Sequence, residues 1–181
     1  MERQLEFEDS RQNLEKYLEY ISQNRHSIIF ILDGLENKRN IAALFRLGDA
    51  ARIEHLYLYQ ANLPEDLHKI KRISRSTHDF LNSTLLSSKK ELIQLKEHYE
   101  FVALEITTHS IPYFKFQYQK PIALIIGNEK KGISAEVLQL CERSIHIPMM
   151  GRNTSMNVAM ATGIATYGLL EKMGCLQKNE A

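Results

Sequence analysis

The sequence predicts a single α/β domain with a parallel sheet covered by helices on both faces, and three observations carry this prediction. Short apolar runs alternate along the chain with stretches in which apolar residues recur at helical spacing. The runs at 27–32 and 122–126 are almost unbroken in apolar residues, which is typical of strands buried on both faces. The length of 181 residues suits one domain with short appended helices.

Local signals set the order of the elements. Apolar residues at every third or fourth position indicate helices. Pro64 suits the first turn of one helix, and Ser87 and Ser88 suit the cap of another. Residues 74–86 carry no clear signal. In chain order we expect helices over 8–24, 40–51, 64–73, 89–97, 134–141 and 155–172, and strands at 27–32, 55–59, 101–106, 122–126 and 144–147.

Composition and charge exclude several classes of protein. Apolar residues make up 44% and charged residues 25% of the chain, so it is neither disordered nor collagen-like. Lys and Arg number 23 against 22 Asp and Glu, which excludes a uniformly basic nucleic-acid binder but allows a local basic face. Cys141 and Cys175 are too few for a disulfide framework or a zinc site.

The lengths of the apolar runs and the character of the N-terminus predict where in the cell the protein is found. The longest apolar runs fall short of the roughly 20 residues that a membrane span needs. The N-terminus has no apolar signal core. We therefore expect a soluble, cytoplasmic protein that does not bind a membrane.

Three polar segments follow predicted strands. Because the carboxyl ends of parallel strands meet at one edge of a sheet, ligands bind there. We therefore expect the functional site where these segments come together. The segments are Asn37 to Asn40 with Arg46, Gly127 to Ser134, and Pro148 to Asn157.

The second segment resembles the start of a phosphate-binding loop. Gly127 and Gly132 have the spacing of that motif after an apolar strand, but the motif then requires a lysine followed by Ser or Thr. Ile133 stands at the lysine position, before Ser134, which suits a helix cap. Without the lysine a triphosphate loses its main counter-charge, which argues against a nucleotide triphosphatase. The glycines still indicate a sharp turn or a close backbone approach.

The third segment leads into a long apolar helix. Thr154 or Ser155 can cap this helix, whereas capping alone does not explain Asn157 in the first turn. Small residues on the helix permit the close approach of another helix, either in the fold or from a second chain. Apolar and small residues lie side by side on it: Met160, Ile164 and Tyr167 next to Ala161, Ala165 and Gly168.

Together the three segments resemble motifs one, two and three of the SpoU/TrmH family, which comprises SPOUT-superfamily RNA 2′-O-ribose methyltransferases. The order of the motifs and the spacing within and between them agree, and the resemblance covers about residues 27–172. The matching stretches are Asn40-Ile-Ala-Ala-Leu-Phe-Arg46, Leu124-Ile-Ile-Gly127-Asn-Glu129-Lys-Lys-Gly132-Ile-Ser134 and Ile147-Pro-Met-Met-Gly151-x3-Ser155-Met-Asn157-Val-Ala.

The resemblance implies a fold, a cofactor and an assembly. The fold would be an α/β-knot, in which the C-terminal stretch of the parallel-sheet domain threads a loop to make a deep trefoil knot. The cofactor would be S-adenosylmethionine, with S-adenosylhomocysteine as product, and the protein would be a homodimer with its C-terminal helix in the interface. We expect a helical extension over 1–26, the SPOUT domain over 27–173 and a tail over 174–181.

Motif positions also imply roles for particular residues. A guanidinium stays protonated, so we expect Arg46 to clamp a phosphate and polarise the hydroxyl instead of acting as a base. The resemblance places Arg46, Asn40, Glu129, Ser155 and Asn157 on the catalytic side. It places Leu104, Gly127, Ile147 and Met156 at the cofactor.

The expected partner is RNA. Only about 26 residues precede the first strand, whereas many rRNA-modifying relatives carry an RNA-binding domain there, so we favour tRNA, with guanosine as the nucleotide. We expect Arg39, Lys69, Lys71, Arg72, Lys130, Lys131 and Arg152 to contact phosphates, although a solvated charged face explains the cluster at 68–75 equally well.

Two alternatives stay open. In the first, the protein methylates rRNA instead of tRNA; in the second, it is an α/β-knot protein that binds RNA without catalysis. The intact set of polar motif residues argues against the inactive protein. The histidines, including His78 and His109, have no partner at ligand spacing, so we expect no metal.

Overall fold

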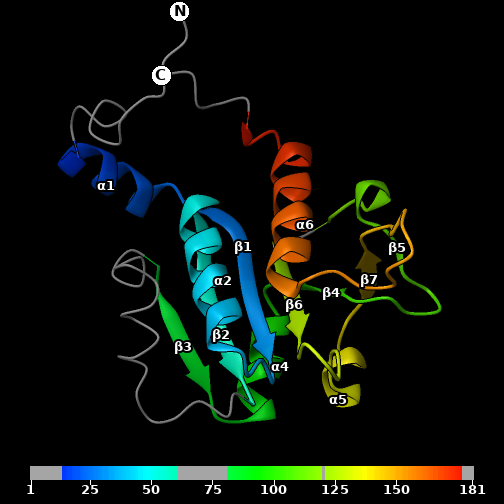
Figure 1. Cartoon of the computed structure of the whole chain (residues 1–181). Helices are drawn as coiled ribbons and strands as arrows, with labels where there is room; N and C mark the ends of the chain where they lie inside the picture. The colour runs from blue at the N-terminus through cyan, green and yellow to red at the C-terminus, as the bar shows by residue number, and fades with distance from the viewer. Residues whose placement is uncertain (1–13, 61–80, 120, 177–181) are drawn as a thin grey trace, which may run out of the picture.

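The computed structural model describes residues 14–60, 81–119 and 121–176. Within them seven strands form one sheet in which each neighbouring pair is parallel, in the order β3-β2-β1-β6-β4-β7-β5 (Figure 1). This confirms the predicted α/β class. The strands are β1 (His26–Asp33), β2 (Ile53–Tyr59), β3 (Ser83–Leu86), β4 (Glu100–Leu104), β5 (Ile111–Pro112), β6 (Ile122–Gly127) and β7 (Arg143–His146).

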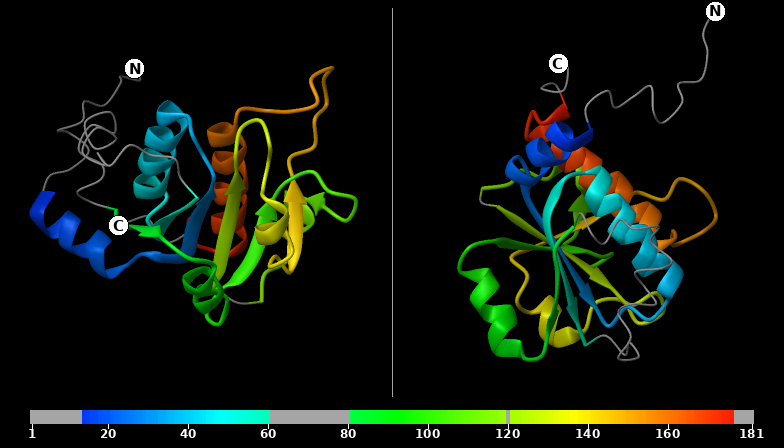
Figure 2. Two further views of the ribbon diagram at one scale, coloured as in Figure 1. Left: turned by 90° about the horizontal axis from the view of Figure 1, so that it is seen from below. Right: turned by 90° about the vertical axis from the view of Figure 1, so that its left-hand side faces the viewer.

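Helices cover both faces of the sheet. Those described are α1 (Leu14–Gln23), α2 (Lys38–Ala50), α4 (Lys89–Lys96), α5 (Ala135–Leu138), α6 (Val158–Lys172) and the short 3-10 helix η2 (Tyr113–Lys115). Helices α2 and α6 lie on one face, and α4 and α5 on the other (Figure 2). None of the helices described is both long and apolar enough to cross a membrane.

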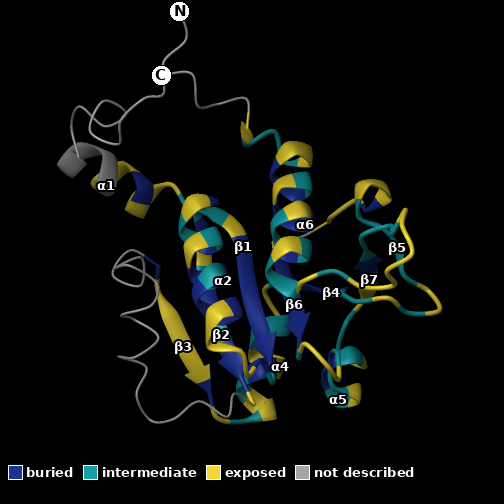
Figure 3. Cartoon of the chain, viewed as in Figure 1, coloured by how far each residue is buried: buried dark blue, intermediate teal, exposed yellow. Residues whose placement is uncertain are grey.

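Each face of the sheet has its own apolar core, which explains the unbroken apolar runs. In β1, Phe30 and Leu32 pack toward α2 and α6, while Ile29 and Ile31 pack toward α4 and α5. All four are fully buried (Figure 3). Alternate side chains of a strand point to opposite faces, so a strand covered on both sides must be apolar at every position.

The sheet brings distant segments together at its carboxyl edge. Strand β6 lies between β1 and β4, so that Asp33 at the end of β1 pairs with Gly127 at the end of β6. Helix α2 packs beside α6. The segments that leave β1, β4, β6 and β7 therefore start from one edge, as the sequence predicted.

The segment between β4 and β6 covers the C-terminal half of α6. The Lys172 ammonium donates hydrogen bonds of 2.8 Å to the carbonyl groups of Phe114 and Phe116. Gly168 leaves room for the Tyr113 ring, because an added Cβ would lie 2.7 Å from its Cε2 atom. The trefoil knot implied by the resemblance stays a prediction.

Most predicted elements are present, and the differences concern their ends and two short strands. The last helix begins at Val158, three residues later than expected, because Asn157 is its N-cap; neither Thr154 nor Ser155 caps it. Strand β4 ends at Leu104 instead of residue 106, and α5 spans only four residues. Strands β3 and β5 were not predicted, and the helix expected over 64–73 lies outside the described residues.

The predicted serine cap of α4 is confirmed. Ser88 is the N-cap, and its side chain accepts a hydrogen bond from the Glu91 backbone N–H. The Glu91 carboxylate in turn accepts from the backbone N–H and the hydroxyl of Ser87. These bonds lower the pKa of Glu91 below its ordinary value. Ser134 occupies the N-cap position of α5 as expected, but its side chain makes no cap hydrogen bond.

Candidate functional site

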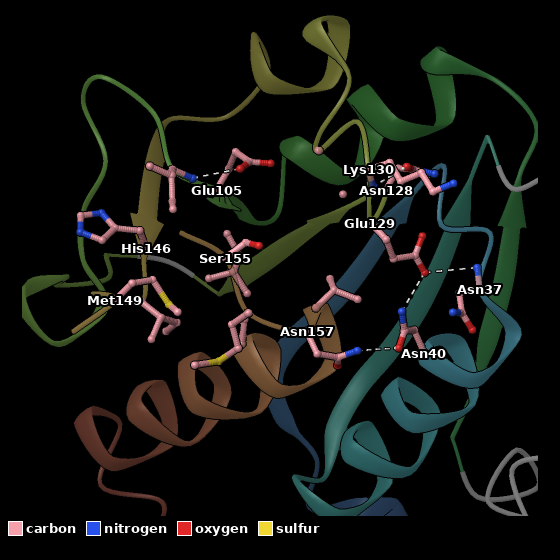
Figure 4. A pocket seen from close by; sticks show the side chains of 18 residues that line it. Asn37, Asn40, Glu105, Asn128, Glu129, Lys130, His146, Met149, Ser155 and Asn157 are labelled. Carbon is pink, nitrogen blue, oxygen red and sulfur yellow. Dashed lines mark hydrogen bonds between the residues drawn. The ribbon is translucent and has the colours of Figure 1, made fainter. Parts of the chain in front are cut away.

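A cavity of about 510 Å³ opens at the carboxyl edge of the sheet (Figure 4). Its walls come from the start of α2, the end of β4, the loop after β6, the end of β7 and the start of α6. The lining residues are Asn37, Asn40, Leu104, Glu105, Ile106, Gly127, Asn128, Glu129, Lys130, Gly132, His146, Ile147, Met149, Ser155, Met156, Asn157, Val158 and Ala161.

Hydrogen bonds between side chains join three of these walls. The Asn40 side-chain amide donates to Glu129 Oε1 at 2.9 Å, and its Oδ1 accepts from Asn157 Nδ2 at 3.0 Å. The backbone N–H of Asn37 also donates to Glu129 Oε1, at 3.2 Å. Asn40 is 8% exposed, so these bonds satisfy a buried amide. The three polar segments are thus held in one site.

Asn157 has two roles at once. Its Oδ1 accepts from the backbone N–H groups of Ala159 and Met160, at 3.0 and 3.3 Å, which caps α6. Its amide nitrogen donates to Asn40, which lies on the first turn of α2. The position that capping alone did not explain is therefore a cap that also links α6 to α2.

Hydrogen bonds favour the ionised form of Glu129. Partial burial opposes the charge, but hydrogen bonds from the Asn40 side chain and from backbone N–H groups, including that of Asn37, outweigh it. The pKa of Glu129 therefore lies below its ordinary value. Since its carboxylate binds Asn37 and Asn40, Glu129 fixes the loop after β6 against the start of α2.

The loop after β6 is closed on itself. The backbone groups of Asn128 and Gly132 exchange hydrogen bonds of 3.0 and 2.9 Å, and Asn128 Nδ2 donates to the carbonyl of Gly34 at 2.7 Å. A Cβ on Gly127 would overlap the backbone of Gly132 and Ile133. The two glycines therefore serve a tight turn in which backbone meets backbone.

Two carboxylates anchor the end of this loop. Glu105 Oε2 accepts from the Ile133 N–H at 3.2 Å, and Asp33 Oδ2 accepts from the Ser134 N–H at 2.7 Å. Asp33 is 2% exposed, and this burial raises its pKa although the hydrogen bond from Ser134 lowers it in part. Its other oxygen, Oδ1, has no partner within the described part of the chain.

The cavity gathers most of the predicted site residues. Those that line it are Asn40, Glu129, Ser155 and Asn157 from the catalytic set, Leu104, Gly127, Ile147 and Met156 from the cofactor set, and Lys130. Arg46 is exposed on α2 and does not line the cavity. Arg39, Lys131 and Arg152 are exposed outside the lining, and Lys69, Lys71 and Arg72 lie outside the described residues.

Some lining residues were not predicted. Glu105 was assigned to the interior of a strand, although β4 ends one residue before it. Asn128 lies inside the second motif, where only its neighbours were singled out. Asn37, Gly132 and Met149 lie inside the predicted polar segments but were given no role in the site, and the lining residues outside those segments are Ile106, His146, Val158 and Ala161. Ile106 follows β4, and His146 and Val158 flank motif residues, whereas Ala161 lies within α6 and had no such signal.

The lining suits a ligand that is part apolar and part cationic. Leu104, Ile147 and Met156 offer apolar surface for a planar base. Glu105 and Glu129 bring carboxylates that favour a positive charge. The cavity volume falls within the range of about 300 to 1,000 Å³ for small-molecule sites, so the residues fit S-adenosylmethionine. Among the described residues there is no group of three His, Cys, Asp or Glu side chains that could hold a metal ion.

The fold and site define a class of protein: a parallel α/β domain whose nucleoside-sized pocket is built from the loops at the carboxyl edge. The sequence profile described as the SpoU rRNA Methylase family matches residues 27–167. The chain belongs to this family. The membership confirms the predicted family, the enzyme class of methyltransferase and the cofactor S-adenosylmethionine.

Two relatives are similar to this chain over most of its length. The first is named "tRNA (guanosine(18)-2'-O)-methyltransferase", from Aquifex aeolicus; it is 29% identical over 85% of this chain and 74% of the relative. The second is "23S rRNA (guanosine-2'-O-)-methyltransferase RlmB", from Blochmanniella floridana, 29% identical over 84% of this chain. The chain spans 62% of the length of that second relative.

Solved structures share the fold. The A. aeolicus TrmH/SpoU tRNA modifying enzyme has a TM-score of 0.74 and 26% identity, and the match covers 92% of this chain and 89% of that one. The SpoU methyltransferase AviRb from Streptomyces viridochromogenes, in complex with AdoMet, has a TM-score of 0.73 and 24% identity, and the match covers 89% and 64% of the two chains. The second likeness concerns the fold alone.

Proposed function

We propose that this protein transfers the methyl group of S-adenosylmethionine to a ribose 2′-hydroxyl of RNA, with a guanosine of tRNA as the favoured substrate. The observation that carries the proposal is the hydrogen-bond chain from Glu129 through Asn40 to Asn157, which joins all three motif segments at one cavity. The relative named for guanosine 18 of tRNA supports the choice of tRNA. The relative named for 23S rRNA supports rRNA as the second candidate.

The chemistry assigns separate tasks to the residues. S-adenosylmethionine, when bound, would supply an electrophilic methyl group. Glu129 brings a negative charge that favours a cationic ligand, and Asn40 and Asn157 fix the helix ends that flank the reacting groups. Ser155 also lines the cavity, where it offers a polar contact for the ribose. Positioning of this kind can lower a barrier by roughly 7 to 11 kcal/mol.

The position of Arg46 outside the cavity leads us to include a homodimer in the proposal. It lies six residues after Asn40 on α2, and it is exposed outside the cavity of its own chain. Helix α6, which packs beside α2, exposes Met160, Ile164 and Tyr167 by 61, 36 and 42%. We propose that a second copy covers this apolar face, and that Arg46 then clamps an RNA phosphate beside the ribose.

Exposed cations near the cavity are suited to the RNA backbone. Lys130 lines the cavity, and Arg39, Lys131 and Arg152 lie on segments that border it. Each phosphate contact releases counterions, so binding should weaken as salt rises. Neutralising Lys130 and Lys131 together should reduce the slope of log affinity against log salt by about 2.

The decisive experiment uses labelled S-adenosylmethionine with separated tRNA and rRNA, followed by analysis of the methylated nucleoside. We expect 2′-O-methylguanosine in tRNA. Label in rRNA alone would favour the second candidate, and a base-methylated nucleoside would refute the ribose assignment. Calorimetry with S-adenosylhomocysteine separates an enzyme from an inactive RNA-binding protein, because only the enzyme needs to keep the cofactor site.

A further inference from the structure

Glu105 lines the cavity directly after β4, and its carboxylate is fixed by backbone donors. Its Oε1 accepts from the Ile106 N–H at 3.0 Å, and its Oε2 accepts from the Ile133 N–H at 3.2 Å. The group also packs closely on Gly132, where an added Cβ would lie 2.5 Å from Oε2. The carboxylate is therefore oriented before any ligand enters.

These bonds leave acceptor capacity on the carboxylate. An ionised carboxylate has about four lone-pair sites, and the N–H groups of Ile106 and Ile133 take two of them. A carboxylate accepts and does not donate, so a ligand group that binds here must be a donor. Two neighbouring oxygens suit a vicinal diol. In other parallel α/β proteins an acidic residue beside the pocket binds a ribose hydroxyl in this way.

We propose that Glu105 accepts hydrogen bonds from the ribose hydroxyl groups of the cofactor's adenosine, an inference that rests on the proposed function. Leu104 precedes Glu105 in the chain, and Ile147 follows β7, in which Ile145 pairs with Leu104; both residues line the cavity and suit the adenine base. Glu129, the other carboxylate of the lining, lies across the cavity and is engaged by Asn37 and Asn40 (Figure 4). Glu105 is therefore the carboxylate available on the β4 side.

Asp33 offers a matched control. It anchors the same loop through the next backbone N–H, that of Ser134, but it does not line the cavity. Loss of either carboxylate should loosen the loop. Only the loss of Glu105 should remove a contact to the ligand.

The test measures affinities by calorimetry for S-adenosylhomocysteine and for its 2′,3′-dideoxy analogue. The wild-type protein should prefer S-adenosylhomocysteine by roughly 10- to 100-fold, as expected for hydrogen bonds to a charged acceptor. Glu105→Ala should bring this preference to within about 3-fold. Asp33→Ala should keep the wild-type preference even if it binds both ligands more weakly. If the alanine variants do not fold, Glu105→Met, which keeps the side-chain length without an oxygen acceptor, and Asp33→Asn provide the same comparison.

The outcomes separate this inference from the function on which it rests. An undiminished preference in the Glu105 variant would reduce Glu105 to a loop anchor and overturn the inference, while the cofactor assignment would stand. A wild-type protein that binds both ligands equally would also overturn the inference. A wild-type protein that binds neither ligand would overturn the cofactor site itself, and this inference with it.

Discussion

Asn157→Ala removes a helix cap and a link between helices with one substitution. The cap consists of two hydrogen bonds, from the N–H groups of Ala159 and Met160, and the loss of such a cap costs about 1 kcal/mol. The link is the 3.0 Å bond to Asn40 Oδ1. Because Asn40 is 8% exposed, an unsatisfied oxygen there costs about 1 to 3 kcal/mol. We expect a total loss of about 2 to 4 kcal/mol.

Urea unfolding at a fixed protein concentration measures this loss, since association would make stability depend on concentration. Asn157→Ser is the control. Its hydroxyl can still cap α6 but is too short to reach Asn40, so it should lose only the link and retain about 1 kcal/mol relative to alanine. If Asn157→Ala cost less than about 0.5 kcal/mol, or if both variants lost the same amount, the dual role of Asn157 would be wrong.

Three further predictions concern the same region and the sheet. Glu129 has a lowered pKa, so its hydrogen bonds stabilise the fold fully at pH values above 4.5, and this stability is lost as the pH falls through the folded-state pKa. Glu129→Gln should therefore flatten the dependence of the urea midpoint on acid pH. An unchanged dependence would contradict the role of the Glu129 carboxylate. Gly127→Ala should abolish S-adenosylhomocysteine binding in calorimetry, because the added methyl overlaps the backbone of Gly132 and Ile133; wild-type affinity would show that the loop can widen. Burial raises the pKa of the Cys141 thiol to about 12. At pH 8 a thiolate-directed alkylating reagent should therefore leave Cys141 unmodified in the folded protein and label it in urea, as measured by peptide mass spectrometry. Rapid labelling without urea would contradict the raised pKa.

The sheet could be predicted because its signal is local. Strands β1 and β6 are covered on both faces, so their sequences are apolar at nearly every position and stand out. The loops that follow them could then be assigned to one edge from topology alone. Strand β5 gave no such signal, since it has two residues and exists only through its pairing with β7.

The details of the site depend on contacts between distant segments. Thr154, Ser155 and Asn157 are all acceptable N-cap residues by local chemistry. Asn157 is the one that caps α6, and it also donates a hydrogen bond to Asn40 on α2. Glu105 lies just beyond the strand and binds the Ile133 N–H; topology places the Ile133 loop at the same edge but does not identify which of its groups Glu105 meets. In both cases the deciding partner is far away in the chain, beyond the reach of periodicity or propensity.

The position of β6 in the sheet has a consequence for the order in which the chain folds. Ile122 of β6 pairs with both Ile28 of β1 and Glu100 of β4, so two earlier strands remain without their shared neighbour until a late segment is available. Pairings between such distant residues are slow to form. During synthesis, the inner edges of β1 and β4 stay open to pairing with other chains until β6 inserts. The loop that carries Glu129 follows β6 directly, so the walls of the cavity come together only after β6 has joined the sheet.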